Sequence, residues 1–541
     1  MTPTRLEQLS LSLEGSPHLR QLKPYTHTPG LGANERQEES EGLRQHRDPQ
    51  PRLGPGWQSL HKLGGGALAY WISFRQQPYA KKNFTAFGGL SSQRTLPSSG
   101  LRDAIPAFGG LSLFFAGLTI SITLKGLQSI VRSFRSDYGA FYVFDRSRVQ
   151  TNWNLWTSQL PGIRPYYAVK CNPDRTLLQT LASLGAGFDC ASGRELMEVA
   201  EVGYKKGQFK DHVVYANPCK PMRDLQKAKA LGAPTTVVDS FEEVDKLASV
   251  QWQGDALLRL RVEDTGSLMP FSRKFGLTAD KASEIASYAK AKGIQLKGVS
   301  FHVGSGCLLP EQYKQAIKTS HDAITKLNLS GHDADLVDLG GGYFSTKETF
   351  EQAARKIRSC QFHYPKKELR YIAEPGRFFA ESAFDLFVQV IGKKPHDVSG
   401  WRYTIDESLY GQFSCIPFDH KKPFWIRIPT SYEGKDLPKR KRGKGTLYGR
   451  TCDSLDMIAS SSDMEELEVG DWLWFPNMGA YTSVTASEFN GFPKPPLHGI
   501  DSQIMLPTVE QIVEDGFAER FPKGIKTVTA VSIQEECPAV A

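Results

Sequence analysis

The chain has 541 residues, of which 40% are hydrophobic and 23% are charged, the composition of an ordinary soluble globular protein with about two or three domains. Its formal net charge of +8 is spread along the sequence, so we expect no nucleic-acid partner. The eight cysteines form no Cys-x-x-Cys pair, which excludes a zinc site and a disulfide framework and fits reduced thiols in a cytoplasmic protein.

The N-terminal part is rich in Gly, Pro, Gln, Arg and Ser and shows little periodicity. We predict a disordered or poorly specified leader over residues 1–105, and no signal peptide in Met1–Gln21. A connecting segment over residues 106–145 is expected to pack on a β domain. Within it, Ala107–Leu124 is predicted to form a buried strand and helix, because Gly, Ser and Thr interrupt the apolar stretch and it is at the short end of what spans a bilayer. A membrane anchor is the alternative. A mis-assigned gene start is a further explanation for part of the leader.

From Pro165 onward, short apolar runs alternate with amphipathic stretches of helical length. This alternation predicts an α/β domain over residues 146–385 that is a (β/α)8 TIM-type barrel, rather than an open sheet. The predicted strands are Tyr166–Lys170, Gly187–Ser192, Val213–Pro218, Thr235–Ser240, Ala256–Val262, Gly298–Gly304, Leu336–Gly342 and Tyr371–Arg377. The predicted helices include Pro173–Leu184, Phe241–Val250, Ala279–Lys292 and Glu311–Asn328. Two helix starts have capping-box spacing, Ser192 with Glu195 and Ser240 with Glu243.

After the last barrel strand the pattern changes to short β runs separated by turn residues, with no long helix before Asp501–Asp515. We therefore predict a separate, mostly antiparallel β domain over residues 386–541, joined by the strand Ala140–Asp145. Its predicted strands are Phe384–Ile391, Trp401–Ile405, Phe424–Ile428, Asp471–Phe475 and Tyr481–Thr485. The densest basic run, Lys439–Arg442, is expected to be a solvated loop, with a nuclear-localisation or anion-binding patch as the alternative.

Functional groups of a TIM-type barrel gather at the C-terminal ends of its strands. Lys170 ends the first predicted strand, where a partly desolvated amine is expected to have a lowered pKa and can form a Schiff base with an aldehyde. A lone lysine at a strand end is more often a side chain that extends to solvent. Here, however, polar residues or glycines end the other strands as well, namely Asp189, Asn217, Arg259, His302, Gly340, Gly341, Gly342, Glu374 and Arg377.

This set of residues suits pyridoxal 5′-phosphate. Loops after the seventh and eighth barrel strands usually bind phosphate, successive glycines let backbone N–H groups approach an anion, and Arg377 adds a charged donor. Glu374 could keep the pyridine nitrogen protonated, or form a salt bridge with Arg377. His302 could stack on the ring, or be a satisfied core histidine. Ser305 and Gly306 offer further donors to the phosphate.

Around these positions the chain carries short motifs in a fixed order, which are Tyr167-Ala168-Val169-Lys170-Cys171-Asn172, Phe188-Asp189-Cys190-Ala191-Ser192, Tyr215-Ala216-Asn217-Pro218-Cys219-Lys220, His302-Val303-Gly304-Ser305-Gly306, Asp338-Leu339-Gly340-Gly341-Gly342, Ala373-Glu374-Pro375-Gly376-Arg377, Cys452-Asp453-Ser454-Leu455-Asp456 and Asn477-Met478-Gly479-Ala480-Tyr481-Thr482. Each motif is weak alone, but the set resembles the eukaryotic, fungal-like ornithine decarboxylases, which are class II ornithine, lysine and arginine decarboxylases. The resemblance implies the alanine-racemase-type fold, a barrel followed by a β domain, in a head-to-tail homodimer.

The resemblance also implies roles for individual residues. The cofactor would be held by Lys170, Asp189, Arg259, His302, Ser305, Gly340, Gly341, Gly342, Glu374, Arg377 and Tyr481, with no metal. The substrate would be held by Asp419, Asp453, Tyr410 and Phe418. Cys452 would protonate the α-carbon after carbon dioxide leaves, so the catalytic residues would be Lys170, Cys452, Glu374 and His302. In the family Cys452 and Asp453 come from the partner subunit, so the active sites are shared, and Lys274 and Asp456 match an intersubunit ion pair.

The sequence departs from the family pattern at the substrate end. Arg450 stands where proline is usual, Ser454 replaces a glycine, Phe418 replaces a tyrosine, and Asp406-Glu407-Ser408 replaces Asn-Asp-Gly. We predict a decarboxylase of a basic amino acid, most simply of L-ornithine to putrescine, with an antizyme-type regulator as a candidate partner. The alternatives are a lysine or other diamino-acid decarboxylase of specialised metabolism, such as alkaloid synthesis, a non-catalytic regulator resembling the antizyme inhibitors, and an alanine racemase.

Overall fold

The computed structural model describes residues 125–135, 139–202, 212–361, 368–396, 399–428 and 440–500. All of them lie in the compact unit Ser99–Ala541. The predicted leader, the apolar stretch Ala107–Leu124 and the predicted helix Asp501–Asp515 fall outside these residues. Among the helices that the structure does describe, none is both long enough and apolar enough to cross a membrane.

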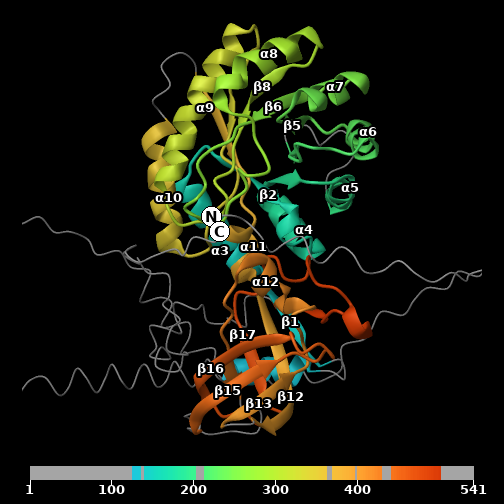
Figure 1. The fold of residues 1–541 in the computed structure, drawn as a ribbon, viewed down its shortest axis with the longest axis vertical. Helices are drawn as coiled ribbons and strands as arrows, with labels where there is room; N and C mark the ends of the chain where they lie inside the picture. The colour runs from blue at the N-terminus through green and yellow to red at the C-terminus, as the bar shows by residue number, and fades with distance from the viewer. Residues whose placement is uncertain are drawn as a thin grey trace, which may run out of the picture. The chain divides into compact units, whose positions relative to one another are not determined.

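Eight parallel strands close into a barrel, as predicted (Figure 1). They are β2 (Arg164–Ala168), β3 (Gly187–Cys190), β4 (Val213–Tyr215), β5 (Thr235–Val238), β6 (Asp255–Arg259), β8 (Leu296–Ser300), β10 (Leu336–Asp338) and β11 (Arg370–Ala373). Each strand begins within two residues of its predicted start but ends two to four residues earlier than predicted. The predicted ends are wrong because the chain leaves the strand conformation there, as at Gly304, Gly340 and Gly342, whose φ angles are positive.

Helices surround the barrel strands in Figure 1. They are α3 (Arg146–Gln159), α4 (Arg175–Leu184), α5 (Gly193–Val202), α6 (Met222–Leu231), α7 (Phe241–Ser249), α8 (Ala282–Ala291), α9 (Glu311–Leu329) and α10 (Lys347–Gln361). The capping box at α5 is present, because Ser192 accepts a hydrogen bond from Glu195 N at 3.2 Å and Glu195 accepts one from Ala191 N at 2.7 Å. The box at α7 is only half formed, since the Glu243 carboxylate instead pairs with the buried Lys220 at 3.1 Å.

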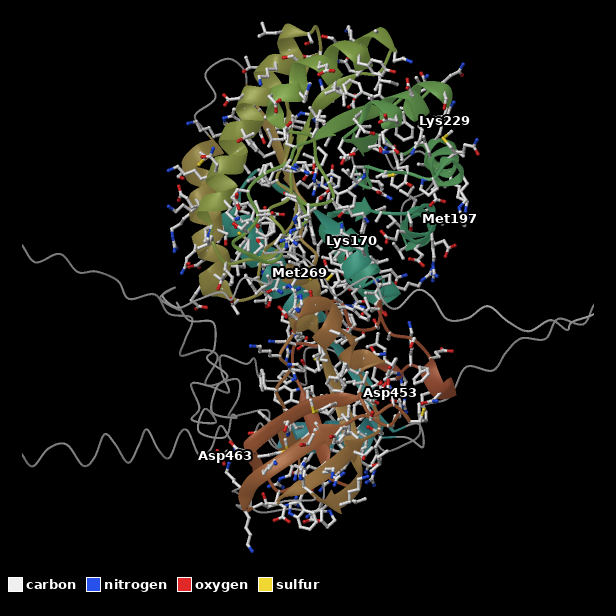
Figure 2. The ribbon with its side chains drawn as sticks, viewed as in Figure 1. Lys170, Met197, Lys229, Met269, Asp453 and Asp463 are labelled. Carbon is white, nitrogen blue, oxygen red and sulfur yellow. The ribbon has the colours of Figure 1, made fainter. Side chains whose placement is uncertain are left out.

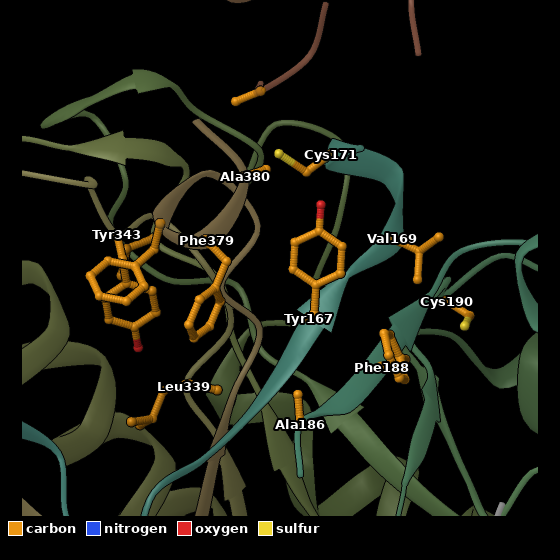
Figure 3. Packing of buried hydrophobic residues seen from close by; sticks show 14 of the residues in the cluster. Tyr167, Val169, Cys171, Ala186, Phe188, Cys190, Leu339, Tyr343, Phe379 and Ala380 are labelled. Carbon is orange, nitrogen blue, oxygen red and sulfur yellow. The ribbon is translucent and has the colours of Figure 1, made fainter. Parts of the chain in front are cut away.

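Successive residues of a barrel strand face opposite sides, and β2 shows the consequence. Tyr166 belongs to an apolar cluster that fills the barrel, with Val214, Val237, Leu257, Leu336 and Ile372 from the other strands. Tyr167 belongs to the larger core outside the strands, together with Phe188 (Figure 3). The interior is therefore closed by apolar side chains, and polar chemistry is confined to the mouth at the C-terminal ends of the strands.

A second sheet of eight strands has the order β14-β17-β12-β13-β15-β16, with β1 paired to both β12 and β18. The strands are β1 (Phe141–Asp145), β12 (Phe384–Pro395), β13 (Trp401–Ile405), β14 (Ile426–Ile428), β15 (Arg442–Tyr448), β16 (Met457–Glu465), β17 (Trp472–Phe475) and β18 (Leu497–Ile500). Most pairs are antiparallel, whereas β13 with β15 and β1 with β18 are parallel. The predicted recruitment of Ala140–Asp145 is confirmed by the β1–β12 pairing.

The β prediction was wrong in three places. Tyr481–Thr485 is a turn rather than a strand, because Tyr481 adopts a positive φ of 54°. The strands β15, β16 and β18 were not predicted, since β15 contains two glycines and β16 a run of serines, which are weak strand signals. The basic run is only partly a loop, because Arg442 begins β15 and Arg440 pairs with Asp471.

Residues 125–134 are helical and pack on this sheet through Leu127, Ile130 and Val131. Their apolar side chains share one cluster with Phe141 of β1 and Trp474 of β17. The part of the connecting segment that the structure describes thus contacts the sheet. The exact limits of the predicted domains stay a prediction.

Replacing Trp156 of α3 tests how much the packing of helices against the barrel contributes to stability. Its side chain is fully buried, stacks on Phe350 and donates a hydrogen bond to Ile163 O at 2.8 Å. We expect Trp156→Ala to lower the free energy of unfolding by about 3–5 kcal/mol, through the cavity it leaves and the lost hydrogen bond. The control Leu329→Ala alters a side chain that is 84% exposed and should change it by less than about 0.5 kcal/mol. Equal urea midpoints for the two variants would contradict this assignment of the core.

Candidate active site

Lys170 lies just after β2, in the 3-10 turn η3 (Val169–Cys171). Its ammonium group pairs with the carboxylate of Asp189, which is fully buried on β3, while the Lys170 side chain is 37% exposed. Burial lowers the pKa of Lys170, but the charges of Asp189 and Glu374 raise it more, so the pKa lies above its ordinary value. The predicted lowering of this pKa is wrong for the chain alone, because two carboxylates face the amine.

Glu374 follows β11 and is 3% exposed. Its Oε1 atom is buried and has no hydrogen-bond partner within the described part of the chain. Burial, together with the nearby Asp189 and Asp338, raises the pKa of Glu374 well above its ordinary value. Asp338 is itself held in place, since it accepts hydrogen bonds from Gly340 N and Ser300 Oγ, both at 3.0 Å. The site therefore presents an unmet carboxyl oxygen that suits a donor on a cationic ring.

The glycine run after β10 brings backbone close to these groups. A Cβ atom on Gly340 would lie 2.1 Å from Phe301 O, and one on Gly342 would lie 2.7 Å from Gly304 O. A Cβ atom on Gly341 would lie 2.7 Å from His302 Nε2. Because these separations are shorter than van der Waals contact, only glycine fits, and the turn can approach a ligand with its backbone.

His302 presents a neutral ring to the same cavity. Its Nδ1 atom accepts a hydrogen bond from Gly304 N at 3.0 Å, and its ring centroid lies 4.9 Å from that of Phe271. Burial lowers the pKa of His302 well below its ordinary value, and the positive charges of Arg259 and Lys170 lower it further. Arg259 itself ends β6 and is 7% exposed. An uncharged planar ring is therefore available for stacking.

Arg377 opens the short helix α11 (Arg377–Ala380) and connects the barrel to the second sheet's segments. Its Nη2 atom donates to Ser305 Oγ at 3.3 Å and to Asp419 Oδ1 at 2.6 Å. Its guanidinium lies 5.4 Å from the centre of the Tyr481 ring, and Tyr481 N donates to Cys171 O at 3.0 Å. The guanidinium can thus serve an anion beside Ser305 while it holds Asp419.

These residues line one cavity with about 300 Å³ of empty space. Its walls include the predicted cofactor residues Lys170, His302, Ser305, Gly341, Gly342, Glu374, Arg377 and Tyr481. Asp189, Arg259 and Gly340 lie outside the lining. Asp189 acts on the cavity through Lys170, and Arg259 through His302. The sequence prediction missed Tyr343 and Gly376, which line the cavity as well. Gly376 lies within the quoted motif that ends at Arg377, and Tyr343 directly follows Gly342, so the motifs were the available signal.

The predicted substrate residues occupy different surroundings. Asp419 ends α12 (Cys415–Asp419) and is 4% exposed, whereas Phe418 beside it is 62% exposed. The Oδ2 atom of Asp419 is buried and has no hydrogen-bond partner among the residues described. Arg377 therefore holds one carboxylate oxygen of Asp419 and leaves the other available to a cationic ligand.

Cys452 and Asp453 lie on the loop after β15, and neither lines the cavity that contains Lys170. Figure 2 shows Asp453 well apart from Lys170. The Cys452 thiol is exposed, and Asp453 accepts a hydrogen bond from the Tyr410 hydroxyl. One chain alone thus does not bring Cys452 and Asp453 to the amine of Lys170.

Asp456 closes the same loop, and its carboxylate is satisfied within its own chain. It accepts hydrogen bonds from Thr451 N at 3.0 Å, from Thr451 Oγ1 at 2.6 Å and from Leu409 N at 2.7 Å. Lys274 is exposed, with its ammonium 5.0 Å from the Phe275 ring. The ion pair that the resemblance implies is therefore not formed inside one chain.

Comparison with known proteins agrees with this geometry. Residues 146–381 match the family described as pyridoxal-dependent decarboxylase, pyridoxal binding domain. The chain is 37% identical over 382 residues to ornithine decarboxylase of Schizosaccharomyces pombe, covering 70% of this chain and 87% of that protein. The chain belongs to the ornithine decarboxylase family. It is also 35% identical over 402 residues to ornithine decarboxylase of Mus musculus, covering 70% of this chain and 85% of that protein. It is 36% identical over 378 residues to antizyme inhibitor 2 of Xenopus laevis, covering 67% of this chain and 81% of that protein.

Solved structures give the same family and fold. The arginine decarboxylase of Paramecium bursaria Chlorella virus, bound to agmatine, has a TM-score of 0.65 and 34% identity, covering 70% of this chain and 100% of that one. The lysine/ornithine decarboxylase of Vibrio vulnificus, complexed with putrescine, has a TM-score of 0.62 and 28% identity, covering 70% and 98%. This ornithine decarboxylase family member therefore has the predicted fold, a (β/α)8 barrel with a mostly antiparallel sheet.

Pyridoxal 5′-phosphate, the cofactor of the family, fits the donors and acceptors of the cavity. The amine of Lys170 and the unmet Oε1 of Glu374 are the groups that its aldehyde and ring nitrogen require. The glycines and Arg377 form an anion-binding wall, and Nε of Arg377 is buried with no hydrogen-bond partner in the described residues. Both ends of the cofactor thus meet complementary groups.

The role of Gly341 in cofactor binding can be tested by adding a single methyl group at this position. We expect Gly341→Ala to weaken pyridoxal 5′-phosphate binding by roughly 5- to 150-fold, because overpacking costs about 1–3 kcal/mol and its Cβ atom would clash with His302 and Glu374 O. Spectrophotometric titration of the dialysed protein measures the affinity. The matched control is Gly443→Ala on β15, where the structure has nothing within 4 Å of the added Cβ atom. Unchanged affinity in Gly341→Ala would place the phosphate elsewhere.

Proposed function

We propose that this protein is a pyridoxal 5′-phosphate-dependent carboxy-lyase that converts L-ornithine to putrescine and carbon dioxide. The convergence of Lys170, Glu374 and Arg377 on one cavity carries this proposal. The similarity to ornithine decarboxylases of fission yeast and mouse over most of their lengths supports ornithine as the substrate.

When bound, the cofactor supplies a ring that accepts the electron pair left at the α-carbon as carbon dioxide departs. Glu374 would accept a hydrogen bond from the protonated ring nitrogen at its unmet Oε1. The positive charge of the ring would oppose burial and the charges of Asp189 and Asp338, which raise the pKa of Glu374 in the chain alone. Arg377, Ser305 and the glycine run would hold the phosphate. Lys170 would hold the cofactor through its aldehyde carbon, with Asp189 orienting the amine.

The substrate end would select a second ammonium group. We propose that Asp419 and Asp453 accept the distal ammonium of ornithine, and that Tyr410 orients Asp453 through their hydrogen bond. The unmet Oδ2 of Asp419 supports this role. A substrate that lacks the second ammonium would leave buried carboxylate charge unpaired, which disfavours its binding. Phe418 would border this end of the site.

We further propose a homodimer in which each site takes Cys452 and Asp453 from the partner. Their loop is remote from Lys170 within one chain, and Leu455 beside them is 77% exposed although it is a large apolar side chain. A partner surface would cover such a side chain. Cys452 would then deliver the proton to the α-carbon. A cytoplasmic location and an antizyme-type regulator stay predictions.

The substrate assignment is tested by mass spectrometry of the products from ornithine, lysine and arginine. We expect putrescine from ornithine as the main product, and Lys170→Ala should abolish both turnover and the visible absorbance of the bound cofactor. Preferred turnover of lysine or arginine would reassign the substrate, in line with the structural relatives that act on them. No turnover by wild-type protein would favour a regulator, and a borohydride-reducible adduct at another lysine would reassign the cofactor lysine.

The shared site is tested by mixing two inactive variants, Lys170→Ala and Cys452→Ala. Each mixed dimer would contain one site with both residues intact and one with neither. With free exchange and equal amounts, half the dimers are mixed, so activity should recover to about a quarter of the wild-type level. If size-exclusion data confirm exchanged dimers and the mixture stays inactive, Cys452 and Lys170 act within one chain.

A further inference from the structure

Two departures of this chain from the family pattern, Arg450 and Glu407, meet in a second cavity with about 210 Å³ of empty space. The cavity lies beside the loop Gly449–Asp456, here named the Cys452 loop, which carries Cys452 and Asp453. Gln412, Phe492 and Lys494 also line it.

Arg450 contacts the chain on both sides of this cavity. Its backbone N donates to Glu407 O at 3.2 Å, a bond that a proline at this position could not form because it has no N–H. Its Nη2 atom donates to Pro493 O at 3.2 Å, and its guanidinium lies 4.3 Å from the centre of the Phe492 ring. Arg450 therefore links the segment after β13 to the segment before β18.

The same two segments hold the Cys452 loop. Cys452 N donates to Asn490 Oδ1 at 3.1 Å, and the Tyr410 hydroxyl donates to Asp453. The two segments also contact each other, since Tyr410 and Phe489 place their ring centroids 4.5 Å apart. A change in the spacing of the segments would therefore move both Cys452 and Asp453.

Glu407 brings a buried carboxyl group to the same cavity as Arg450. Its side chain is 1% exposed, and its Oε1 atom accepts a hydrogen bond from Ser408 N at 2.7 Å. Its Oε2 atom has no hydrogen-bond partner in the part of the chain described. Burial raises the pKa of Glu407 to about 7, while the charge of Arg450 opposes that rise. The negatively charged form thus depends on the arginine.

We propose that Arg450 and Glu407 form a positioning pair that holds the Cys452 loop in the orientation in which Cys452 protonates the α-carbon. This inference rests on the proposed function. Neither residue lines the cavity of Lys170, so both act through the loop. Loss of the pair should displace Cys452 and Asp453 together, so it should misdirect the proton and also weaken the binding of ornithine.

The test compares Arg450→Met with wild-type dimer. We expect kcat to fall roughly 10- to 100-fold, because a small displacement of a catalytic group costs this much in rate. KM for ornithine should rise as well, because Asp453 moves with Cys452. The share of turnovers that release an aldehyde instead of putrescine should rise. The double variant Arg450→Met with Glu407→Gln should be less impaired than Arg450→Met, since the glutamine removes a buried charge that the methionine leaves without a cation.

The matched control is Arg442→Met, which removes another arginine of the same chain segment and its exposed pair with Asp463 at 2.9 Å. It should keep the wild-type product ratio. Hydrogen exchange should rise in Arg450→Met at residues 449–456 but not in the barrel. The positioning role would be refuted if a folded Arg450→Met dimer kept the wild-type kcat and product ratio. It would also be refuted if hydrogen exchange became faster throughout the chain, since general loosening would then account for the lost rate. An inactive wild-type protein would instead refute the proposed function, and the local exchange would still decide the positioning role.

Discussion

Two buried carboxylates, Asp189 and Glu374, face the amine of Lys170 at the mouth of the barrel. The three groups come from β3, from the segment after β11 and from the turn after β2, and β2 pairs with both of those strands. The pairing of β2 with β11 joins the first and last strands of the barrel, so the charges meet only when the barrel closes. A cationic ring nitrogen beside Glu374 would offset part of this negative charge.

Arg377 connects the Lys170 cavity to Asp419. It contacts Ser305 on one side and Asp419 on the other, and it also pairs with Glu381 at 3.5 Å. Burial tends to raise the pKa of Glu381, but the charges of Lys421 and Arg377 outweigh it and lower the pKa to about 2. These ion pairs span the barrel and the segments of the second sheet. The position of Asp419 therefore depends on that of Arg377 and Ser305.

The Cys452 loop is ordered by its own chain although Cys452 is exposed. At the base of the loop, Asp456 accepts three hydrogen bonds. At its tip, Asn490 accepts a hydrogen bond from Cys452 N, and the Tyr410 hydroxyl donates one to Asp453. A loop that is already formed loses little conformational freedom when it meets a partner. This arrangement suits residues that must act at a surface supplied by another subunit.

The sequence by itself determined the starts of the barrel strands, the glycine run and the positions of Lys170 and Glu374. These features are local, because apolar periodicity and strand ends can be recognised over a few residues. The strands β15 and β16 escaped prediction since their glycines and serines weaken the local signal. Only the tertiary structure decided the raised pKa of Lys170, the contact of Arg377 with Asp419, and the distance of Cys452 from the Lys170 cavity. Those properties arise between residues far apart in the chain, where barrel closure rather than local sequence sets which charges meet.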